Sequence, residues 1–354
     1  MPNTLFIGTD EAGYGPNLGP LVITATSWQA PSGTACDKLW DLLAEVLTND
    51  PAKDDRRLFV ADSKQVYSPA SGILDLETAV LSFLSALNLQ PATTAELGAI
   101  VAGSLFDEQR KRDPTLATAG TPLPLAAFPD EVAESREAIL NAFRQTQVRL
   151  VAIRSRIIFP PEFNELVSRA GSKGVILSQS TMDLVHQLCP KQFHSHHTED
   201  LRRGPKRLFA LEDDEATVSS PTAAETGENI DSVHVYCDKH GGRNRYDALI
   251  SEQFDDQFVF RREESTAISR YQMGKVEFCF RTKAEALLPV ALASMVSKYV
   301  RECLMEDFNA FWRNHLPTLK PTRGYPLDAR RFREDIASAV MQLGIEESHF
   351  WRCK

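Results

Sequence analysis

Short apolar runs alternate with longer amphipathic segments along most of the chain. Apolar and β-branched runs predict strands at residues 4–7, 21–25, 58–60, 150–158, 233–237, 258–261 and 276–281, the first two forming a hairpin-like pair. Apolar residues at helical spacing predict helices at residues 36–47, 74–87, 130–145, 161–171, 175–188, 244–254 and 285–311. Strands that alternate with helices in this way indicate an α/β fold.

Two stretches interrupt the alternation. Residues from about 107 to 129 are rich in Pro, Thr, Gly and charge, and residues from about 190 to 229 are first basic and His-rich, then acidic. The second composition cannot bury enough apolar surface to order itself easily, so a long loop is expected there. We interpret residues 1–354 as a single catalytic domain with insertions at about 104–147 and 190–231 and a helical C-terminal segment at about 304–354.

The composition is that of a globular protein, with 43% hydrophobic and 25% charged residues. No apolar run reaches the roughly 20 residues of a membrane span, and no signal peptide is recognisable. The six cysteines are scattered without Cys-x-x-Cys spacing, which favours a reducing, cytoplasmic location. The net charge of −9 argues against a general nucleic-acid coat protein, but it suits a site that gathers carboxylates around divalent cations.

Carboxylates stand where several predicted strands end. Asp10 and Glu11 follow the first strand, Asp238 ends another, and Glu285 follows the strand at 276–281; Asp62 follows a fourth strand, at 58–60. Sites in open α/β sheets gather at strand ends, and several carboxylates that meet there cannot all stay ionised without cations. Oxygen ligands suit Mg²⁺ or Mn²⁺, and two such ions about 4 Å apart promote phosphoryl displacement. A solvated turn is the simpler interpretation of an isolated Asp-Glu pair.

The segment that follows the first two acids is rich in glycine. Gly13 and Gly15 flank Tyr14, and Gly19 follows within the same loop. A loop without Cβ atoms lets a phosphate backbone approach the main-chain N–H groups closely. The loop is therefore a candidate contact surface for a nucleic-acid strand.

Six segments together resemble the type 2 ribonucleases H, the family of ribonucleases HII and HIII. DEAGYGPNLGPLVI (10–23) is similar to the family's Asp-Glu-x-Gly-Arg-Gly motif, and ADSKQV (61–66) to its Asp-Ser-Lys motif. VYCD (235–238) resembles the strand of its third acid, and ALASMVSKYVRECLM (291–305) resembles its Ala-Ser-Ile helix. TRGYPLDARRF (322–332) and GIEESHFW (344–351) resemble its C-terminal segments. The segments occur in the family's order and cover most of the chain outside the two insertions.

The resemblance implies a ribonuclease H-like fold, with a mixed central sheet flanked by helices and a helical C-terminal part. It implies metal-dependent endonucleolytic cleavage of the RNA strand of an RNA–DNA hybrid, with two Mg²⁺ or Mn²⁺ ions as cofactor. The expected partner is the hybrid duplex; no membrane is expected, and no protein partner can be inferred. The residues that it assigns to catalysis and metal binding are Asp10, Glu11, Asp238 and Glu285. Those that it assigns to substrate binding are Gly13, Tyr14, Gly15, Lys64, Ser294 and Tyr325.

Three departures mark the chain as a divergent member. Tyr14 replaces the usual basic residue between the glycines, Glu285 replaces the Asp that is usual in ribonuclease HII, and the N-terminal domain of ribonuclease HIII is not seen. Two alternatives therefore stay open: a hybrid-binding protein with impaired catalysis, and a nuclease of the same fold that acts on another nucleic-acid structure.

Two further groups of residues invite a functional interpretation. His194, His196 and His197 look like a zinc cluster, but they lie in the polar insertion, and a loop is the favoured interpretation. The basic run at 201–207 is either a duplex contact or a solvated turn. A set of arginines close to Tyr325 is the better phosphate-binding patch: Arg323, Arg330, Arg331 and Arg333.

Overall fold

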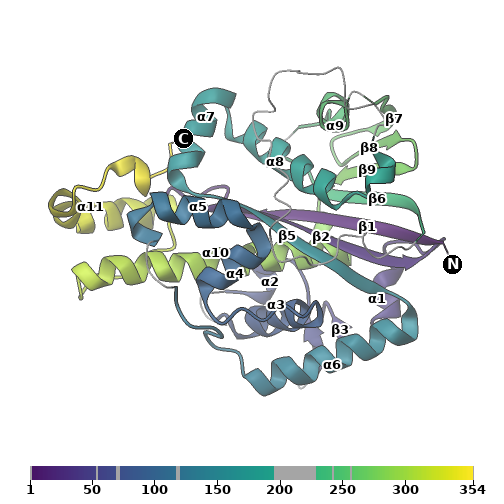
Figure 1. Ribbon diagram of the computed structural model, residues 1–354, viewed down its shortest axis with the longest axis horizontal. Coiled ribbons are helices and arrows are strands. Elements are labelled where there is room, and N and C mark those ends of the chain that lie inside the picture. Colours follow the sequence, from purple (N-terminus) through teal and green to yellow (C-terminus); the bar gives the residue numbers. More distant parts are fainter. Residues whose placement is uncertain are drawn as a thin grey trace.

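A mixed seven-stranded sheet crosses the molecule, with helices on both of its faces (Figure 1). The computed structural model describes residues 2–52, 55–68, 72–116, 120–194, 229–240, 243–255 and 257–353. The strand order is β5-β2-β1-β6-β9-β8-β7, and only β2 and β8 run against the direction of the others. The strands are β1 (Asn3–Ala12), β2 (Leu21–Pro31), β5 (Arg149–Ile158), β6 (Ile230–Asp238), β7 (Phe260–Glu264), β8 (Ile268–Met273) and β9 (Val276–Arg281).

Helices cover the two faces unequally. One face carries α7, α8 and α9, and the other carries α10 with α3, α4 and α6 (Figure 1). Successive apolar side chains of β1 pack on opposite faces of the sheet: Leu5 and Ile7 pack toward α8, and Phe6 packs toward α10. The helices are α1 (Lys38–Leu42), α2 (Ser63–Val66), α3 (Leu74–Ala86), α4 (Thr94–Ala102), α5 (Ser104–Arg112), α6 (Pro129–Thr146), α7 (Pro160–Ala170), α8 (Lys173–Leu188), α9 (Asp247–Gln253), α10 (Leu288–His315) and α11 (Pro326–Leu343).

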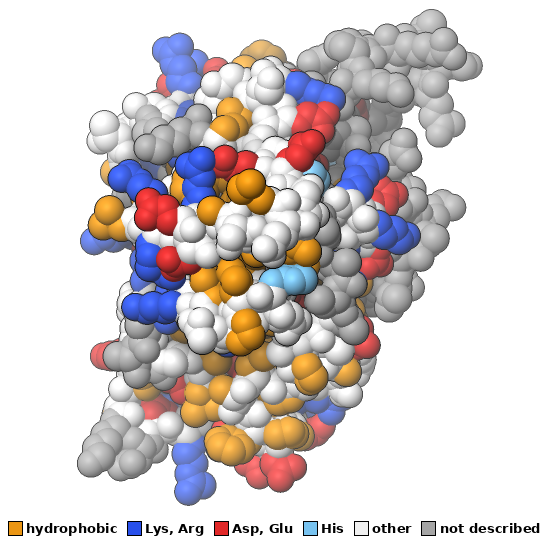
Figure 2. Space-filling model, turned by 90° about the vertical axis from the view of Figure 1, so that its left-hand side faces the viewer, with side chains coloured by type: hydrophobic (Ala, Val, Ile, Leu, Met, Phe, Trp, Pro, Cys, Tyr) orange, Lys and Arg blue, Asp and Glu red, His pale blue; other side chains and the backbone are white. Residues whose placement is uncertain are grey.

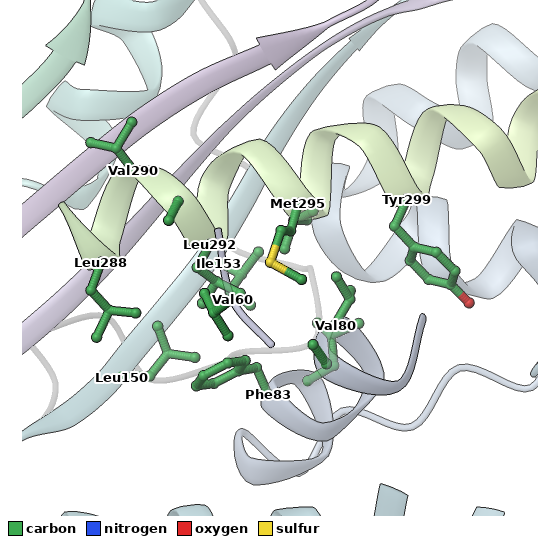
Figure 3. Close-up of a cluster of buried hydrophobic side chains, with 14 of the residues drawn as sticks. Val60, Val80, Phe83, Leu150, Ile153, Leu288, Val290, Leu292, Met295 and Tyr299 are labelled. Carbon is green, nitrogen blue, oxygen red and sulfur yellow. The ribbon is translucent and has the colours of Figure 1, made fainter. Parts of the chain in front are cut away.

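The long helix α10 is the main support of the sheet. Figure 3 shows its side chains, among them Leu292 and Met295, meeting Val80 and Phe83 of α3 in the core. Gly8 of β1 lets α10 come this close, because a Cβ at Gly8 would lie 2.3 Å from the carbonyl carbon of Pro289. Each large apolar side chain buried here contributes about 1.5–3 kcal/mol to folding. Helix α10 is thus fixed against the strand that carries the first two candidate acids.

The C-terminal part is helical, as expected. The second half of α10 and helix α11 enclose a separate cluster around Trp312, Phe308 and Phe332. Leu18, from the glycine-rich loop after β1, is buried in the same cluster. The loop is therefore packed onto the C-terminal segment. No helix in the described ranges is long and apolar enough to cross a membrane.

The expected α/β organisation is confirmed, including the antiparallel pairing of β1 with β2. The helix expected at 36–47 is wrong over most of its length, because only Lys38–Leu42 is helical. Leu47–Thr48 (β3) instead pairs in parallel with Leu58–Phe59 (β4), and this small sheet lies apart from the central one. Tertiary pairing overrides the helical spacing at this point.

Strand β8 was not predicted, because polar residues interrupt its short sequence ISRYQM. It joins β7 and β9 into an antiparallel meander, and β7 lies two to three residues later than expected. The helix expected from residue 285 begins at Leu288. Residues Ala284–Ala286 form a 3₁₀ turn, η3, and Pro289 stands in the first turn of α10. Glu285 therefore belongs to a turn that precedes the helix.

Candidate active site

Three carboxylates meet where β1 and β6 end. The two strands are parallel neighbours, and their register pairs Thr9 with Cys237. Asp10 therefore follows in β1 at the level where Asp238 ends β6, and Glu11 comes directly after it. Both strands are largely apolar up to this level, so buried side chains hold the sheet together while the carboxylates occupy its edge.

Burial raises the pKa of all three carboxyl groups, and neighbouring carboxylates raise it further. The pKa of Asp10 is raised well above its ordinary value, mainly by burial and then by Glu11. Burial and the neighbouring Asp238 raise the pKa of Glu11 to about 7. The pKa of Asp238 is also raised, again chiefly by burial. Three carboxylates that oppose one another's ionisation form an arrangement that a bound cation would relieve.

One lysine and the backbone N–H groups of Lys239 and Ala284 counteract this repulsion. Lys64 lowers the pKa of both Glu11 and Asp238, so its ammonium group is within electrostatic reach of the two carboxylates. The backbone N–H of Ala284 donates to the Asp238 carboxylate. The Asp-Ser-Lys segment and η3 thus both reach the edge of the sheet, although they lie far apart in the sequence.

Serine side chains of α10 support Asp10 from inside. The Ser294 hydroxyl hydrogen-bonds with the Asp10 carboxylate and lies 3.1 Å from the hydroxyl of Ser63. The Ser297 hydroxyl donates to the backbone carbonyl oxygen of Asp10 at 3.0 Å. Ser294 is only 2% exposed. This expected substrate-binding residue therefore lies behind the acids, where it orients Asp10.

The donor set suits a hard divalent cation. One carboxylate oxygen of Asp238, Oδ1, is buried without a hydrogen-bond partner among the described residues. Such an oxygen is costly unless a cation or a water molecule completes its environment. In the part of the chain that the structure describes, no three His, Cys, Asp or Glu side chains are already spaced to enclose a metal ion. A cation held here would therefore draw the carboxylates closer together.

The fourth acid is placed differently from the first three. Glu285 is half-buried in η3, directly after the residue whose N–H binds Asp238. Asp62 is among the main charges that act on the raised carboxyl of Asp238, and Glu285 is not among the main charges on any of the three. Asp62 also caps α2, because its Oδ1 accepts the backbone N–H of Lys64 at 3.1 Å. The structure thus brings Asp62 into the site with a hydrogen bond of its own.

The glycine-rich loop needs glycine at its first position. Gly13 has a φ of +87°, and a Cβ there would lie 2.5 Å from the carbonyl oxygen of Pro20 and 2.6 Å from Nε of Arg301. The loop and the long helix are thus in direct contact beside Glu11. No comparable restriction holds at Gly15, where a Cβ would meet nothing within 4 Å.

Two buried arginines hold the carbonyl groups of this region. Arg301 of α10 donates to Leu18 O at 3.3 Å and to Arg323 O at 2.9 Å. Arg352, near the C-terminus, donates to Gly13 O at 2.6 Å and also to the carbonyl of Pro16. Each arginine is 1% exposed, and burial lowers its pKa. Sequence reasoning missed both residues, although Arg301 lies within a quoted motif.

Two tyrosines border the site. Tyr14 is half-buried against the α8 face, and its pKa is raised by burial and by Glu11. Tyr325 precedes α11 and is 49% exposed, with the Arg301 guanidinium 5.9 Å from the centre of its ring. Both side chains are therefore placed where a bound polymer could meet an aromatic ring.

Other expected groups lie apart from the acids or outside the described residues. His194 stacks on His186 with ring centres 4.0 Å apart, whereas His196, His197 and the basic run at 201–207 lie outside the described ranges. A cavity of about 840 Å³ lies at the opposite end of β1, bordered by Asn3. The first two acids lie at the other end of the same strand, so this cavity is separate from the candidate active site.

No protein-family model and no curated protein matches the chain. Ribonuclease H2 from Pyrococcus horikoshii OT3 is 16% identical, with a TM-score of 0.43 over 98% of this chain and 92% of that one. Ribonuclease HII from Archaeoglobus fulgidus, solved in complex with PCNA, is 14% identical, with a TM-score of 0.37 over 99% and 94% of the two chains.

A third solved structure is Bst-RNase HIII in complex with Mn²⁺. It is 14% identical, and the match has a TM-score of 0.36 and covers 99% of this chain but only 66% of that protein. These structures are ribonucleases of the HII and HIII types, to which the sequence motifs are similar. No protein partner can be inferred from the sequence of this chain, whereas the Archaeoglobus enzyme was solved bound to PCNA.

Proposed function

We propose that this protein is a divalent-metal-dependent endonuclease that hydrolyses the RNA strand of RNA–DNA hybrids. The observation that carries the proposal is the group of three carboxylates at the ends of β1 and β6, all with raised pKa values. Carboxylates that resist joint ionisation and leave Asp238 Oδ1 without a partner suit Mg²⁺ or Mn²⁺. The sequence motifs add the substrate class, because they resemble ribonucleases HII and HIII.

In this proposal Asp10, Glu11 and Asp238 hold the cations, together with Glu285 from η3. When bound, a pair of such ions supplies activation of the attacking water and stabilisation of the leaving 3′-oxygen. Ser294 keeps the Asp10 carboxylate oriented through its hydrogen bond. Lys64 adds a positive charge at the same edge, where a scissile phosphate would bring negative charge.

The loop beside Glu11 supports binding of the nucleic-acid strand. Arg301 and Arg352 draw four carbonyl oxygens toward the interior, among them those of Gly13 and Leu18. Carbonyl groups that point inward leave the outer side of the loop free for contacts with a sugar–phosphate backbone. Tyr14 and Tyr325 border this region and offer rings for stacking on a sugar or base.

The decisive measurement is cleavage of a labelled RNA–DNA hybrid with Mg²⁺ or Mn²⁺. We expect the unaltered protein to cut the RNA strand and Asp10→Asn to lower the rate at least about 100-fold, because a cation ligand is lost. Single-ribonucleotide duplexes and branched DNA belong in the same assay, because they separate hybrid cleavage from action on another structure. Full activity of Asp10→Asn contradicts the proposal.

A hybrid-binding protein without catalysis is the second candidate. Two observations favour it: Asp62 rather than Glu285 is among the main charges that act on Asp238, and the carboxylates are not yet spaced around a cation among the described residues. Tight binding of the hybrid without cleavage across several divalent ions would support this candidate and exclude the first.

A further inference from the structure

Several basic side chains near the site form ion pairs with carboxylates. Lys298 pairs with Glu302 at 2.7 Å. Arg331 pairs with Asp328 and Asp335, and Arg333 pairs with Glu347 at 2.9 Å. Figure 2, which views the molecule from the side where α11 lies, shows basic and acidic side chains next to each other over much of this face. Two of the four arginines expected to bind phosphate, Arg331 and Arg333, are therefore neutralised.

Lys173 and Arg323 differ from these residues. Neither forms an ion pair with a carboxylate in the part of the chain that the structure describes, and each instead lies over the ring of a tyrosine beside the site. A cation held by a ring gains about 0.5–1 kcal/mol at an exposed site and keeps its charge, whereas a carboxylate partner would neutralise it. Such a cation stays available for an anionic ligand.

Lys173 is placed by Tyr14. Its Nζ lies 5.1 Å from the centre of the Tyr14 ring, and both side chains are half-buried. Tyr14 follows Glu11 by three residues, and its pKa responds to the Glu11 charge. Gly174 lies beside the tyrosine, because a Cβ there would be in ordinary contact with the Tyr14 hydroxyl oxygen, at 3.7 Å. The first residue of α8 is thereby held close to the carboxylates.

Arg323 is placed by Tyr67 in a similar way. Its guanidinium carbon lies 5.5 Å from the centre of the Tyr67 ring. That ring is fixed in turn, because the Tyr67 hydroxyl donates to Glu302 Oε2 at 2.8 Å. Lys298 lies over the same ring at 4.6 Å, but Glu302 already neutralises it. Tyr67 directly follows α2, the helix that carries Lys64.

The two cations lie on opposite sides of the carboxylate edge. Tyr14 packs against the core on the α8 face of the sheet, whereas Tyr67 packs against the core on the α10 face. We propose that Lys173 and Arg323, each held by a tyrosine ring, bind backbone phosphates of the nucleic-acid strand on either side of the carboxylates. The inference rests on the proposed function, because it names the strand contacts of that same site.

The test measures binding separately from cleavage. In an Asp10→Asn background, affinity for a fluorescent RNA–DNA hybrid is determined over a series of salt concentrations. We expect Lys173→Ala and Arg323→Ala each to weaken binding about 3- to 10-fold and to reduce the salt slope by about one, as loss of one phosphate contact does. Lys173→Arg should retain the slope, whereas Tyr14→Leu should weaken binding without changing the net charge.

Arg333→Ala is the matched control. Arg333 also lies over an aromatic ring, that of Trp351 at 5.2 Å, but it is paired with Glu347, so its removal should leave affinity and slope unchanged. Thermal unfolding of every variant excludes loss of folding as the cause. Unchanged affinity and slope in Lys173→Ala and Arg323→Ala overturn the inference, as does failure of the parent to bind hybrid. Cleavage by the unaltered protein is scored separately, so binding without cleavage refutes only the proposed function.

Discussion

Glu285 and Asp62 compete for the role of fourth carboxylate. Asp62 acts on Asp238, but its Oδ1 already accepts the backbone N–H of Lys64 in the cap of α2. Glu285 lies next to Ala284, whose N–H binds Asp238. The Glu285 side chain is longer than that of Asp62 and does not cap α2. The backbone thus places Glu285 beside the site, next to the residue that binds Asp238.

We expect Glu285→Gln to raise the Mn²⁺ concentration for half-maximal cleavage about tenfold or more, because a carboxylate ligand becomes a neutral amide. Asp62→Asn should raise this Mn²⁺ concentration less than about threefold. Asn still caps a helix, and Asp62 affects Asp238 only through its charge, without being a cation ligand in this proposal. Titration of cleavage with Mn²⁺ measures both variants. A larger effect of Asp62→Asn would assign the fourth ligand to the Asp-Ser-Lys segment.

At the level of elements, the candidate site residues that could be predicted from the sequence are those that lie next to the end of a strand. Asp10, Glu11 and Asp238 follow apolar runs, and parallel pairing of β1 with β6 brings them to one edge. Arg352 was not predictable in this way, because its role depends on a contact with Gly13, 339 positions earlier in the sequence. Local periodicity carries no information about such long-range contacts, and the same limit explains the pairing of β3 with β4.

The glycine-rich loop yields a prediction of its own. Arg352→Met keeps most of the buried volume but removes the hydrogen bonds to the carbonyls of Gly13 and Pro16. We expect hybrid affinity to fall about tenfold, because the loop is no longer fixed in its binding conformation, while the cleavage rate at saturating substrate changes less than about threefold. Arg352→Lys should restore part of the affinity, which separates loop positioning from a general loss of packing.

Steady-state cleavage kinetics over a range of hybrid concentrations measure this change. Arg144→Ala serves as the control, because Arg144 is exposed on α6 and borders the cavity at the opposite end of β1. If Arg352→Met lowers the cleavage rate at saturating hybrid without changing the affinity, the positioning role of Arg352 is contradicted. Equal kinetics of Arg352→Met and Arg352→Lys would contradict it as well.

For the molecule as a whole, ionisation of the crowded carboxylates costs stability. The pKa of Glu11 is about 7 in the folded state, against an ordinary value of 4.5. A raised folded-state pKa means that the contribution of Glu11 to stability is complete below pH 4.5 and is lost as the pH rises through 7. The metal-free protein at pH 8 therefore carries a penalty of at most about 3 kcal/mol from this carboxylate.

We expect Glu11→Gln, which stays neutral, to unfold at higher urea concentration than the parent at pH 8 in the presence of a chelator. The difference should shrink to near zero at pH 5, where the folded parent is protonated at Glu11. Saturating Mn²⁺ should narrow or reverse this difference in stability at pH 8. The cation stabilises the parent, which keeps all of its carboxylate ligands, more than the variant that has lost one. Glu134→Gln, on an exposed position of α6, is the control and should follow the parent at both pH values. A stability difference that is the same at pH 5 and pH 8 would show that Glu11 does not carry this strain.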